Sequence, residues 1–95
     1  MNPDRVQVKS IVRQRRKELG MTVDDLARAV GVRSSEFIAL IEAGHKVIGL
    51  DRAPAFAAVL QLDVMGFCLC CLSESYPIFH RAVFGDEEPS PPFPR

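Results

Sequence analysis

The sequence lacks the residue groupings on which enzyme active sites depend. Its 95 residues include two histidines, and they contain no glycine-rich phosphate loop, no acidic dyad and no nucleophile placed beside a base. Strand patterns are weak, and no internal repeat is visible. The sequence therefore predicts a protein that is not an enzyme and that uses no cofactor.

Neither a secretory leader nor a membrane-spanning segment is evident. The first ten residues, MNPDRVQVKS, are polar and have no apolar core of the kind that signal peptides carry. The most apolar window, Val59–Leu72, is interrupted by Gln61 and Asp63 and is too short to cross a bilayer. We therefore expect a cytoplasmic protein that does not contact membranes.

Neither sign of charge is in excess. Twelve Lys and Arg residues balance twelve Asp and Glu residues, and a net charge of zero argues against a general binder of polyanions. The distribution is uneven, because the first twenty residues hold six basic groups and two acidic ones. A positive field confined to one end suits a module that meets phosphates locally.

Cysteine is sparse and clustered, since Cys68, Cys70 and Cys71 fall within four positions. An odd number of neighbouring cysteines is a poor disulfide framework and fits a reducing compartment. A zinc site with His80 as a fourth ligand is the alternative, but structural zinc sites take cysteines paired at turns. On one helical segment Cys68 and Cys71 share a face and Cys70 does not, so we expect reduced, buried thiols and no metal.

The sequence does contain apolar residues at helical spacing, separated by glycines and capping residues. This pattern predicts an all-α fold with helices at about residues 4–19, 22–30, 34–43, 51–62, 63–72 and 75–84. The expected N-caps are Thr22, Ser34, Asp51 and Asp63. Residues 86–95 are acidic and then proline-rich, and this segment is expected to be a disordered tail.

The most specific pattern lies between Gly20 and Gly44. It consists of four short motifs, Gly20-Met21-Thr22, Asp25-Leu26-Ala27, Gly31-Val32 and Ile41-Glu42-Ala43-Gly44. Their order resembles the lambda-repressor-like (Xre/Cro) helix-turn-helix family, in which a G-[L/M]-T opening, a D/E-x-L-A helix, a G-V turn and an I-E-x-G exit follow one another. Here no residue separates Asp25 from Leu26. The stretches Asp51–Ala55 and Tyr76-Pro77 are similar to a subgroup common among phage and prophage regulators.

The resemblance implies a helix-turn-helix bundle with extra C-terminal helices. Residues 1–62 would form the DNA-binding module, residues 63–85 a helical dimerisation extension, and residues 86–95 the tail. The module would bind double-stranded DNA as a sequence-specific transcription regulator, either a repressor or an autoregulator. The family also pairs an arginine of the first helix with the glutamate of the exit motif, which implies an ion pair between Arg16 and Glu42.

The DNA contacts implied by the resemblance come from the third helix, its two flanks and the first helix. They are Arg33, Ser34, Ser35, Glu36, Ala39 and Lys46, together with Arg13 and Lys17. We expect Arg33 and Lys46 to hold phosphates, and Ser35 and Glu36 to face base edges. For Arg13 and Lys17 a solvated helix face is the alternative interpretation.

Three departures from the family pattern favour a second hypothesis. Val23 stands where the family has a glutamine that braces phosphate and base contacts, and Arg33 is an extra residue in the turn. The outer face of the third helix lacks the arginine, glutamine and asparagine side chains that read bases in this family. The alternative is a protein-interaction module on the same scaffold, which would dock a partner protein through this helix.

The expected fifth helix is apolar nearly all round, and a chain of this size cannot bury every side of it. Either the last helix covers one face or two chains share it. We favour a homodimer, because helix-turn-helix proteins gain affinity by reading two half-sites. The expected interface residues are Phe67, Leu69, Leu72, Phe79 and Phe84.

Overall fold

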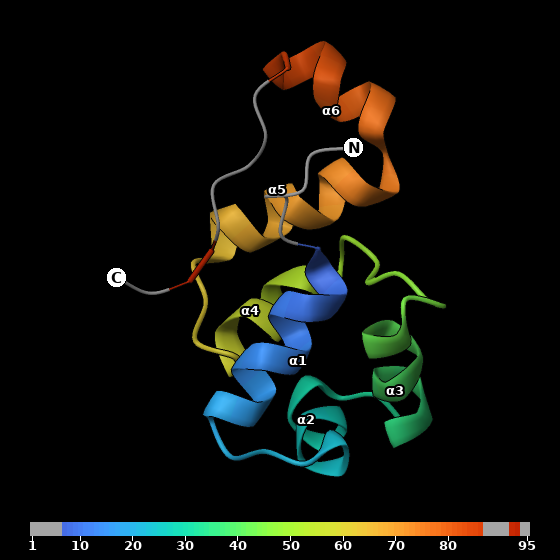
Figure 1. Ribbon diagram of the computed structural model, residues 1–95, viewed down its shortest axis with the longest axis vertical. Helices are drawn as coiled ribbons and strands as arrows, with labels where there is room; N and C mark the ends of the chain where they lie inside the picture. Colours follow the sequence, from blue (N-terminus) through green and yellow to red (C-terminus); the bar gives the residue numbers. More distant parts are fainter. Residues whose placement is uncertain (1–6, 87–91, 94–95) are drawn as a thin grey trace.

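The computed structural model describes residues 7–86 and 92–93, which form helices and the turns that connect them. The helices are α1 (Val8–Glu18), α2 (Val23–Val30), α3 (Ser35–Ala43), α4 (Ala53–Val59), α5 (Val64–Ser75) and α6 (Pro77–Phe84) (Figure 1). No strand occurs in these two ranges, so the expected all-α fold is confirmed. None of the described helices has the length and hydropathy needed to span a bilayer.

Local capping explains where α2, α3 and α5 begin. The Thr22 hydroxyl accepts a hydrogen bond from the Asp25 backbone N–H at 3.0 Å, and the Asp25 carboxylate accepts one from the Thr22 N–H at 2.9 Å. These two bonds complete a capping box. Ser34 caps α3 and Asp63 caps α5, each by accepting from a backbone N–H of the first turn at 3.1 and 2.7 Å. Three of the four expected N-caps are therefore confirmed.

The boundaries of α4 differ from the expectation. Asp51 does not cap the helix, because the N-cap is Arg52, which makes no capping hydrogen bond with its side chain. The Arg52 N–H instead donates to the Gly49 carbonyl at 2.9 Å, within a turn that precedes the helix. Pro54 lies in the first turn, where its missing N–H costs nothing. At the other end Gln61 has a φ of 56°, which stops the helix early.

The outer ends of α1 and α5 also shift. Gln7 has an extended backbone, so α1 begins at Val8, and residues 4–6 of the expected first helix lie outside the described residues. α5 continues to Ser75 instead of ending at Leu72. It ends there because Pro77 follows, and a proline disfavours helical geometry in the residue before it.

The apolar core is continuous from α1 to α5. Its most deeply buried side chains are Ile11, Val12, Leu26, Ile38, Ile41, Phe56, Leu60 and Phe67. Phe67 belongs to α5, so the boundary expected at residue 62 does not divide two cores. The placement of Phe67 at a dimer interface is wrong, because a side chain with no exposed surface in one chain cannot touch a second.

Part of the C-terminal segment packs back onto the helices. Pro92 is buried, its carbonyl accepts from the Asp63 N–H at 2.8 Å, and Phe93 packs against the core. Gly66 permits this approach, because a Cβ atom there would lie 3.4 Å from Pro92 and 2.9 Å from an Asp63 carboxylate oxygen. The expectation of a disordered tail is thus wrong for Pro92 and Phe93, since Pro92 is buried and Phe93 is half-buried against the core. Residues 87–91, 94 and 95 lie outside the described residues.

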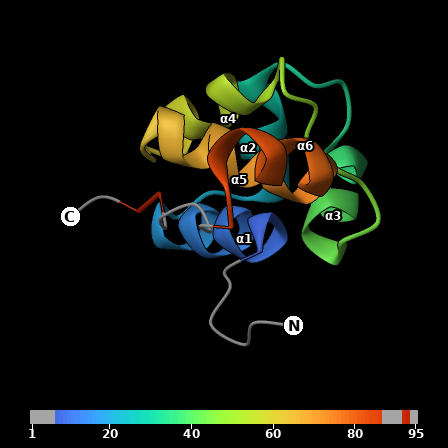
Figure 2. The same ribbon diagram turned by 90° about the horizontal axis from the view of Figure 1, so that it is seen from above.

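The helices are arranged along a molecule whose longest extent is 37 Å. α2 and α3 lie at one end of this axis and α6 lies at the other (Figure 1). Seen from above, α6 is stacked over α5, and α5 in turn covers α1 and α4 (Figure 2). The helix pair α2–α3 and the last helix therefore lie far apart, on opposite sides of the α1, α4 and α5 core.

Candidate nucleic-acid interface

α2 and α3 pack against each other across a short turn. α2 ends at Gly31, whose φ of 80° lies in the left-handed region that favours glycine. The Val32 N–H donates to the Ala27 carbonyl at 3.0 Å, which turns the chain back over α2. Ala27 is itself buried, and its small side chain lets the two helices lie close together. This is the geometry of a helix-turn-helix with α3 as its second helix.

α3 has one buried face and one open face. Ile38 and Ile41 point into the core. Of the residues expected to meet DNA, Ser34, Glu36 and Ala39 are exposed, as is Ala43. Ser35 is half-buried, so the open face at the N-terminal part of α3 consists mainly of the N-cap Ser34 with Glu36 and Ala39.

An ion pair fixes α3 to α1. Arg16 Nε donates to Glu42 Oε2 at 2.7 Å, and Arg16 Nη2 donates to Glu42 Oε1 at 3.0 Å, which is the bidentate geometry of strong arginine–carboxylate pairs. A third bond runs from Arg16 Nη1 to the Met21 carbonyl at 2.8 Å. The hydrogen bond to Glu42 raises the pKa of Arg16. The two side chains are only 13% and 9% exposed, so the pair implied by the resemblance is present and largely shielded from solvent.

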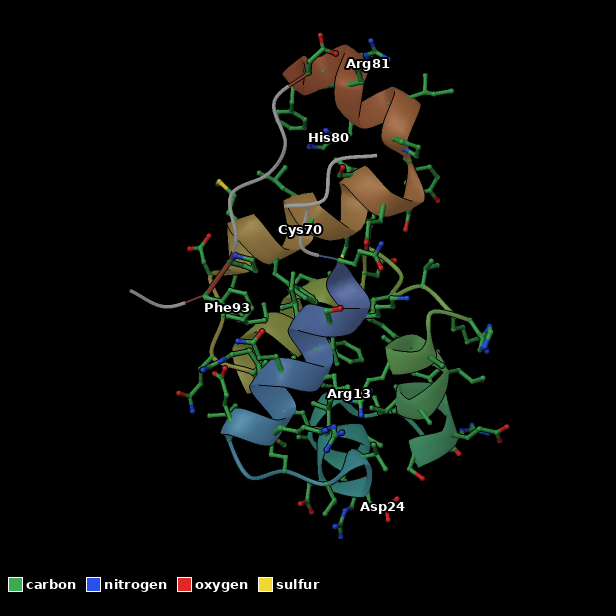
Figure 3. All side chains as sticks on the ribbon, in the orientation of Figure 1. Arg13, Asp24, Cys70, His80, Arg81 and Phe93 are labelled. Atoms are coloured by element: carbon green, nitrogen blue, oxygen red, sulfur yellow. The ribbon has the colours of Figure 1, made fainter. Side chains whose placement is uncertain are left out.

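Position 23 shows why this interface departs from the family pattern. Val23 is the first residue of α2, and it is half-buried against the core. It therefore supplies an apolar contact in place of the glutamine amide that the family pattern has. Asp24, next to it, projects from this end of the molecule (Figure 3). The N-terminus of α2 thus offers neither the amide nor a positive side chain to a phosphate.

The cations named from the sequence are all exposed and lie in three places around α3. Arg33 lies in the turn before the helix, Lys46 follows it, and Arg13 and Lys17 lie on α1. Figure 3 shows the Arg13 side chain projecting outward from α1. Within residues 7–86 and 92–93, none of the four takes part in an ion pair. Their positive charge is therefore available to an anion.

Two cations converge on the ring of Phe37, a half-buried residue of α3. The Lys46 Nζ atom lies 5.3 Å from the ring centroid, and the Arg52 Cζ atom lies 6.0 Å from it. Both distances fit cation–π contacts. No ion pair to Arg52 is found in the part of the chain that the structure describes. Arg52 was not predicted from the sequence, because its contact with Phe37 joins residues fifteen positions apart and leaves no periodic signal.

Lys9 is a second cation that the sequence analysis missed. Its aliphatic stem lies against Gly44, where an added Cβ atom would come within 3.2 Å of Lys9 Cδ. Gly44 ends α3 with a φ of 83°. The Lys9 ammonium group is thus brought to the C-terminal end of α3, where the helix dipole favours a positive charge. The helical spacing of Lys9, Arg13 and Lys17 along α1 was the available signal.

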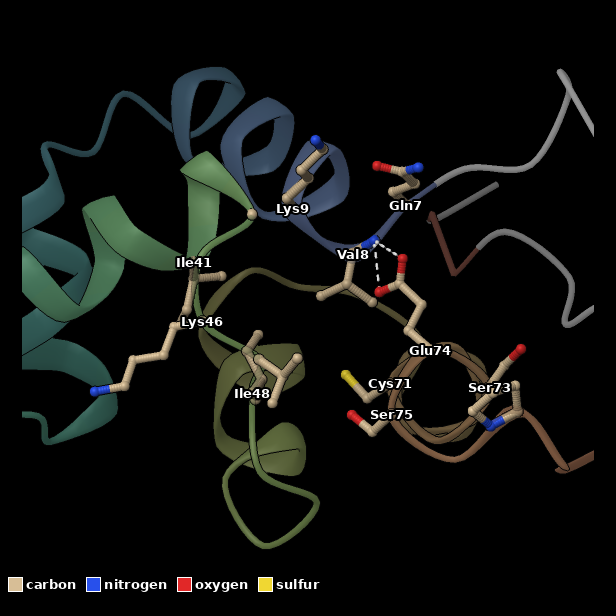
Figure 4. Close-up of a pocket in the computed structure, with 13 residues that line it drawn as sticks. Gln7, Val8, Lys9, Ile41, Lys46, Ile48, Cys71, Ser73, Glu74 and Ser75 are labelled. Carbon is tan, nitrogen blue, oxygen red and sulfur yellow. Dashed lines mark hydrogen bonds between the residues drawn. The ribbon is translucent and has the colours of Figure 1, made fainter. Parts of the chain in front are cut away.

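A groove of about 600 Å³ lies between α1, the segment after α3, and α5 (Figure 4). At its edge both carboxylate oxygens of Glu74 accept from the Val8 N–H, at 3.2 and 3.1 Å. Gln7 provides no side-chain cap, so Glu74 of α5 supplies one across the fold. Lys9 and Lys46 also line the groove. Because its lining comes from α1, from the segment after α3 and from α5, the groove lies where the C-terminal helices meet the helix-turn-helix.

The cysteines lie away from the open face of α3. All three are reduced, with Cys70 and Cys71 buried and Cys68 half-buried. Burial raises the pKa of Cys71 to about 12, and it also raises the pKa of Cys68. Within the described ranges, no three His, Cys, Asp or Glu side chains are grouped so that they could hold a metal ion. The cysteines thus contribute packing surface to α5.

The comparison with known proteins gives one positive result. A family model described as helix-turn-helix matches residues 12–67, which run from α1 into α5. Neither a curated protein nor a solved structure gives a significant match to the chain. The matched range contains Arg16, Glu42, the open face of α3 and Phe67, so the first turn of α5 falls within the family pattern.

Proposed function

The chain belongs to the lambda-repressor-like (Xre/Cro) helix-turn-helix family of DNA-binding regulators, and we propose that it acts as a sequence-specific repressor or autoregulator that binds its operator as a dimer. The observation that carries this proposal is the open face of α3. That face is held in place by the Arg16–Glu42 pair, and cations that have no ion-pair partner in the described chain stand at both ends of the helix.

In this proposal the cations position the protein and the helix face reads the sequence. Arg33 and Lys46 hold the phosphates that pass the two ends of α3, while Arg13 and Lys17 add positive charge from α1. Each phosphate that a cation neutralises releases counterions, so affinity depends steeply on salt. The zero net charge of the chain keeps non-specific binding weak.

The base contacts available to α3 are few, and the side chains that would make them are short. The Ser34 and Ser35 hydroxyls can donate to or accept from base edges, and the Glu36 carboxylate can accept from the N4 group of cytosine. The Ala39 methyl group fits against the methyl group of thymine. A good base contact contributes about 1–3 kcal/mol of discrimination, so this set supports moderate rather than extreme specificity.

The proposed organisation keeps residues 1–62 as the DNA-binding module and residues 63–85 as the extension through which two chains pair. Leu69 and Leu72 of α5 and Phe79 and Phe84 of α6 remain proposed interface residues, since each keeps some exposed surface in the single chain. The Glu74 contact to the Val8 N–H would link the extension to the module.

Fluorescence anisotropy over a salt series tests this proposal. The labelled duplexes are a site selected from the DNA upstream of the gene and a scrambled copy of it. Lys46→Ala and Arg33→Ala should each weaken binding to both duplexes and lower the salt slope by about one unit.

Substitutions on the open face should behave differently. Ser35→Ala and Glu36→Gln should change the preference between the two duplexes while leaving the salt slope near its wild-type value. If the wild-type protein binds no duplex even at low salt, the DNA-binding proposal fails.

A protein-interaction module is the second candidate, and a specific observation favours it. The open face of α3 carries Ala39 and Ala43, and Val23 supplies packing where the family pattern has a polar contact. A small, weakly polar face suits a protein surface as well as a DNA groove. Failure to bind DNA, combined with retained folding and a specific protein partner lost on Ala39→Glu, would favour this candidate.

A further inference from the structure

The polarity of α6 is inverted. Its most buried side chain is His80, which is 6% exposed, whereas Ile78 is 84% exposed. Phe79 and Val83 are each more than half exposed. A surface helix of a soluble domain turns its apolar stripe toward the core and its polar residues toward solvent. α6 buries its histidine and leaves its apolar residues in solvent, so its apolar face is left uncovered by the described chain.

The exposed apolar residues gather on one side of α6. At about 100° per residue, Phe79 and Val83 lie within about 40° of each other, and Ile78 and Ala82 do the same. His80 lies on the other side, where its ring stacks on Phe84 with 4.9 Å between centroids. That side packs against α5, and His80 lies between the two helices (Figure 3). The outward face of α6, defined as Ile78, Phe79, Ala82 and Val83, is therefore a continuous apolar stripe that points away from the fold.

The exposed area is large for a single chain. A fully exposed aromatic side chain presents about 150–250 Å², so the outward face together with Tyr76 and Phe84 exposes on the order of 500 Å² of apolar surface. The largest apolar patch of a typical monomer is about 300–600 Å² and is often functional. A standard interface buries about 800 Å² of each partner, of which about 60% is apolar, or again on the order of 500 Å². The face therefore matches one side of a stable interface in size.

We propose that the outward face of α6 is a self-association surface, through which two copies of this chain pair about a two-fold axis. This inference deepens the proposed dimeric regulator and rests on it for its biological role. It assigns the contact to Ile78, Phe79 and Val83 of α6, rather than to the core side of α5 where Phe67 lies.

A second copy fits this surface better than an unrelated partner for two reasons. Beside the stripe, Arg81 Nε donates to Asp86 Oδ1 of the same chain at 2.7 Å, and the two side chains are 75% and 82% exposed. Because this ion pair carries no net charge, the stripes of two copies can meet about a two-fold axis without repulsion between like charges at the rim. In addition, α6 and α3 lie at opposite ends of the molecule, so pairing through α6 leaves both recognition helices uncovered (Figure 1).

Sedimentation velocity over a concentration series tests the proposal on the full chain. The wild-type protein should approach twice the 10.5-kDa chain mass at micromolar concentration. The double variant Ile78→Lys/Val83→Lys should remain at the mass of one chain, because four lysines would meet across the two-fold axis. Val47→Lys is the matched control, since Val47 is 65% exposed but lies in the segment after α3. This control should dimerise like the wild type.

Two further measurements keep the outcomes separate. Far-UV circular dichroism establishes that the double variant stays folded, which we expect because both side chains are already in solvent. Fluorescence anisotropy with labelled duplexes that contain one half-site or two half-sites then measures the affinity for DNA. The double variant should keep wild-type affinity for a single half-site and lose at least tenfold on the paired duplex.

The proposal is overturned if the wild-type protein stays monomeric over the whole series, or if the double variant dimerises as well as Val47→Lys does. If the wild-type protein is monomeric, the outward face of α6 would be a contact surface for a different protein. A dimer that the double variant abolishes, in a protein that binds no DNA, would uphold the surface and refute the proposed function.

Discussion

Removal of Arg16 should destabilise the protein far more than removal of any exposed arginine. Arg16→Ala deletes the two bonds to Glu42 and the bond to the Met21 carbonyl. It also leaves the Glu42 carboxylate only 9% exposed and without its counter-charge. Breaking a buried pair by removing one partner costs about 3–5 kcal/mol, and the remaining exposure places this loss near the lower end, at about 3 kcal/mol.

Urea denaturation followed by circular dichroism measures this loss directly. A loss of about 3 kcal/mol should also lower the melting temperature by at least about 12 °C, since 1 kcal/mol shifts a domain of this size by about 4–8 °C. Arg13→Ala is the matched control, because Arg13 lies on the same helix, is exposed and forms no ion pair within the described chain. Its change should stay within about 0.5 kcal/mol.

Arg15 is unsuitable as the control, although it is adjacent in the sequence. Its Nε donates to the Leu60 carbonyl at 3.0 Å, so its removal also disturbs a tertiary contact. The double variant Arg16→Met/Glu42→Leu should recover most of the loss, because an apolar pair leaves no stranded charge. If Arg16→Ala and Arg13→Ala unfold at the same urea concentration, the pair does not hold α3 against α1 and the reasoning is refuted.

Three further expectations concern the cation cluster, the capping box and the thiols. Phe37→Leu removes the ring on which Lys46 and Arg52 lie, so the salt slope of DNA binding should fall by up to about one unit. Phe37→Tyr keeps an aromatic ring and should retain the wild-type slope. An unchanged slope in Phe37→Leu would contradict the expectation that the ring positions these two cations. The capping hydrogen bonds, led by one from a backbone N–H, lower the pKa of Asp25. Its stabilising contribution is therefore present at neutral pH and is lost as the pH falls through that lowered value, so Asp25→Asn should unfold with a shallower acid dependence below about pH 4. Iodoacetamide at pH 8 should label native Cys68 faster than Cys71, whose pKa is about 12; equal rates by mass spectrometry would exclude this burial.

The local features of the helix-turn-helix could be predicted because each is encoded by adjacent residues. Thr22 and Asp25 form the capping box with a spacing of three, and Gly31 and Gly44 end their helices in left-handed conformations. These features need no distant partner. The same holds for Ser34 at the start of α3. Local chemistry thus set the turn and the direction of α3.

The orientation of the C-terminal helices could not be predicted in the same way. α5 is apolar nearly all round, so periodicity alone does not distinguish its core side from its outer side. The structure buries Phe67 and leaves Ile78, in α6, almost fully exposed. From the sequence, Phe67 was predicted to be an interface residue and Ile78 was not. Which side of α5 is buried depends on its packing against α4, which is a tertiary contact.

By itself the sequence determined the helical class and the helix-turn-helix, because periodic spacing, caps and motif order are local and additive. The Arg16–Glu42 pair joins residues 26 positions apart, and only the resemblance to the family implied it. Only the tertiary structure brought Arg52 to the Phe37 ring, Glu74 to the start of α1 and Pro92 against α5. These contacts join segments that are 15 to 66 positions apart. Their formation depends on the packing of the whole core, since a side chain can cap or stack on a distant group only after the helices that carry both have been positioned.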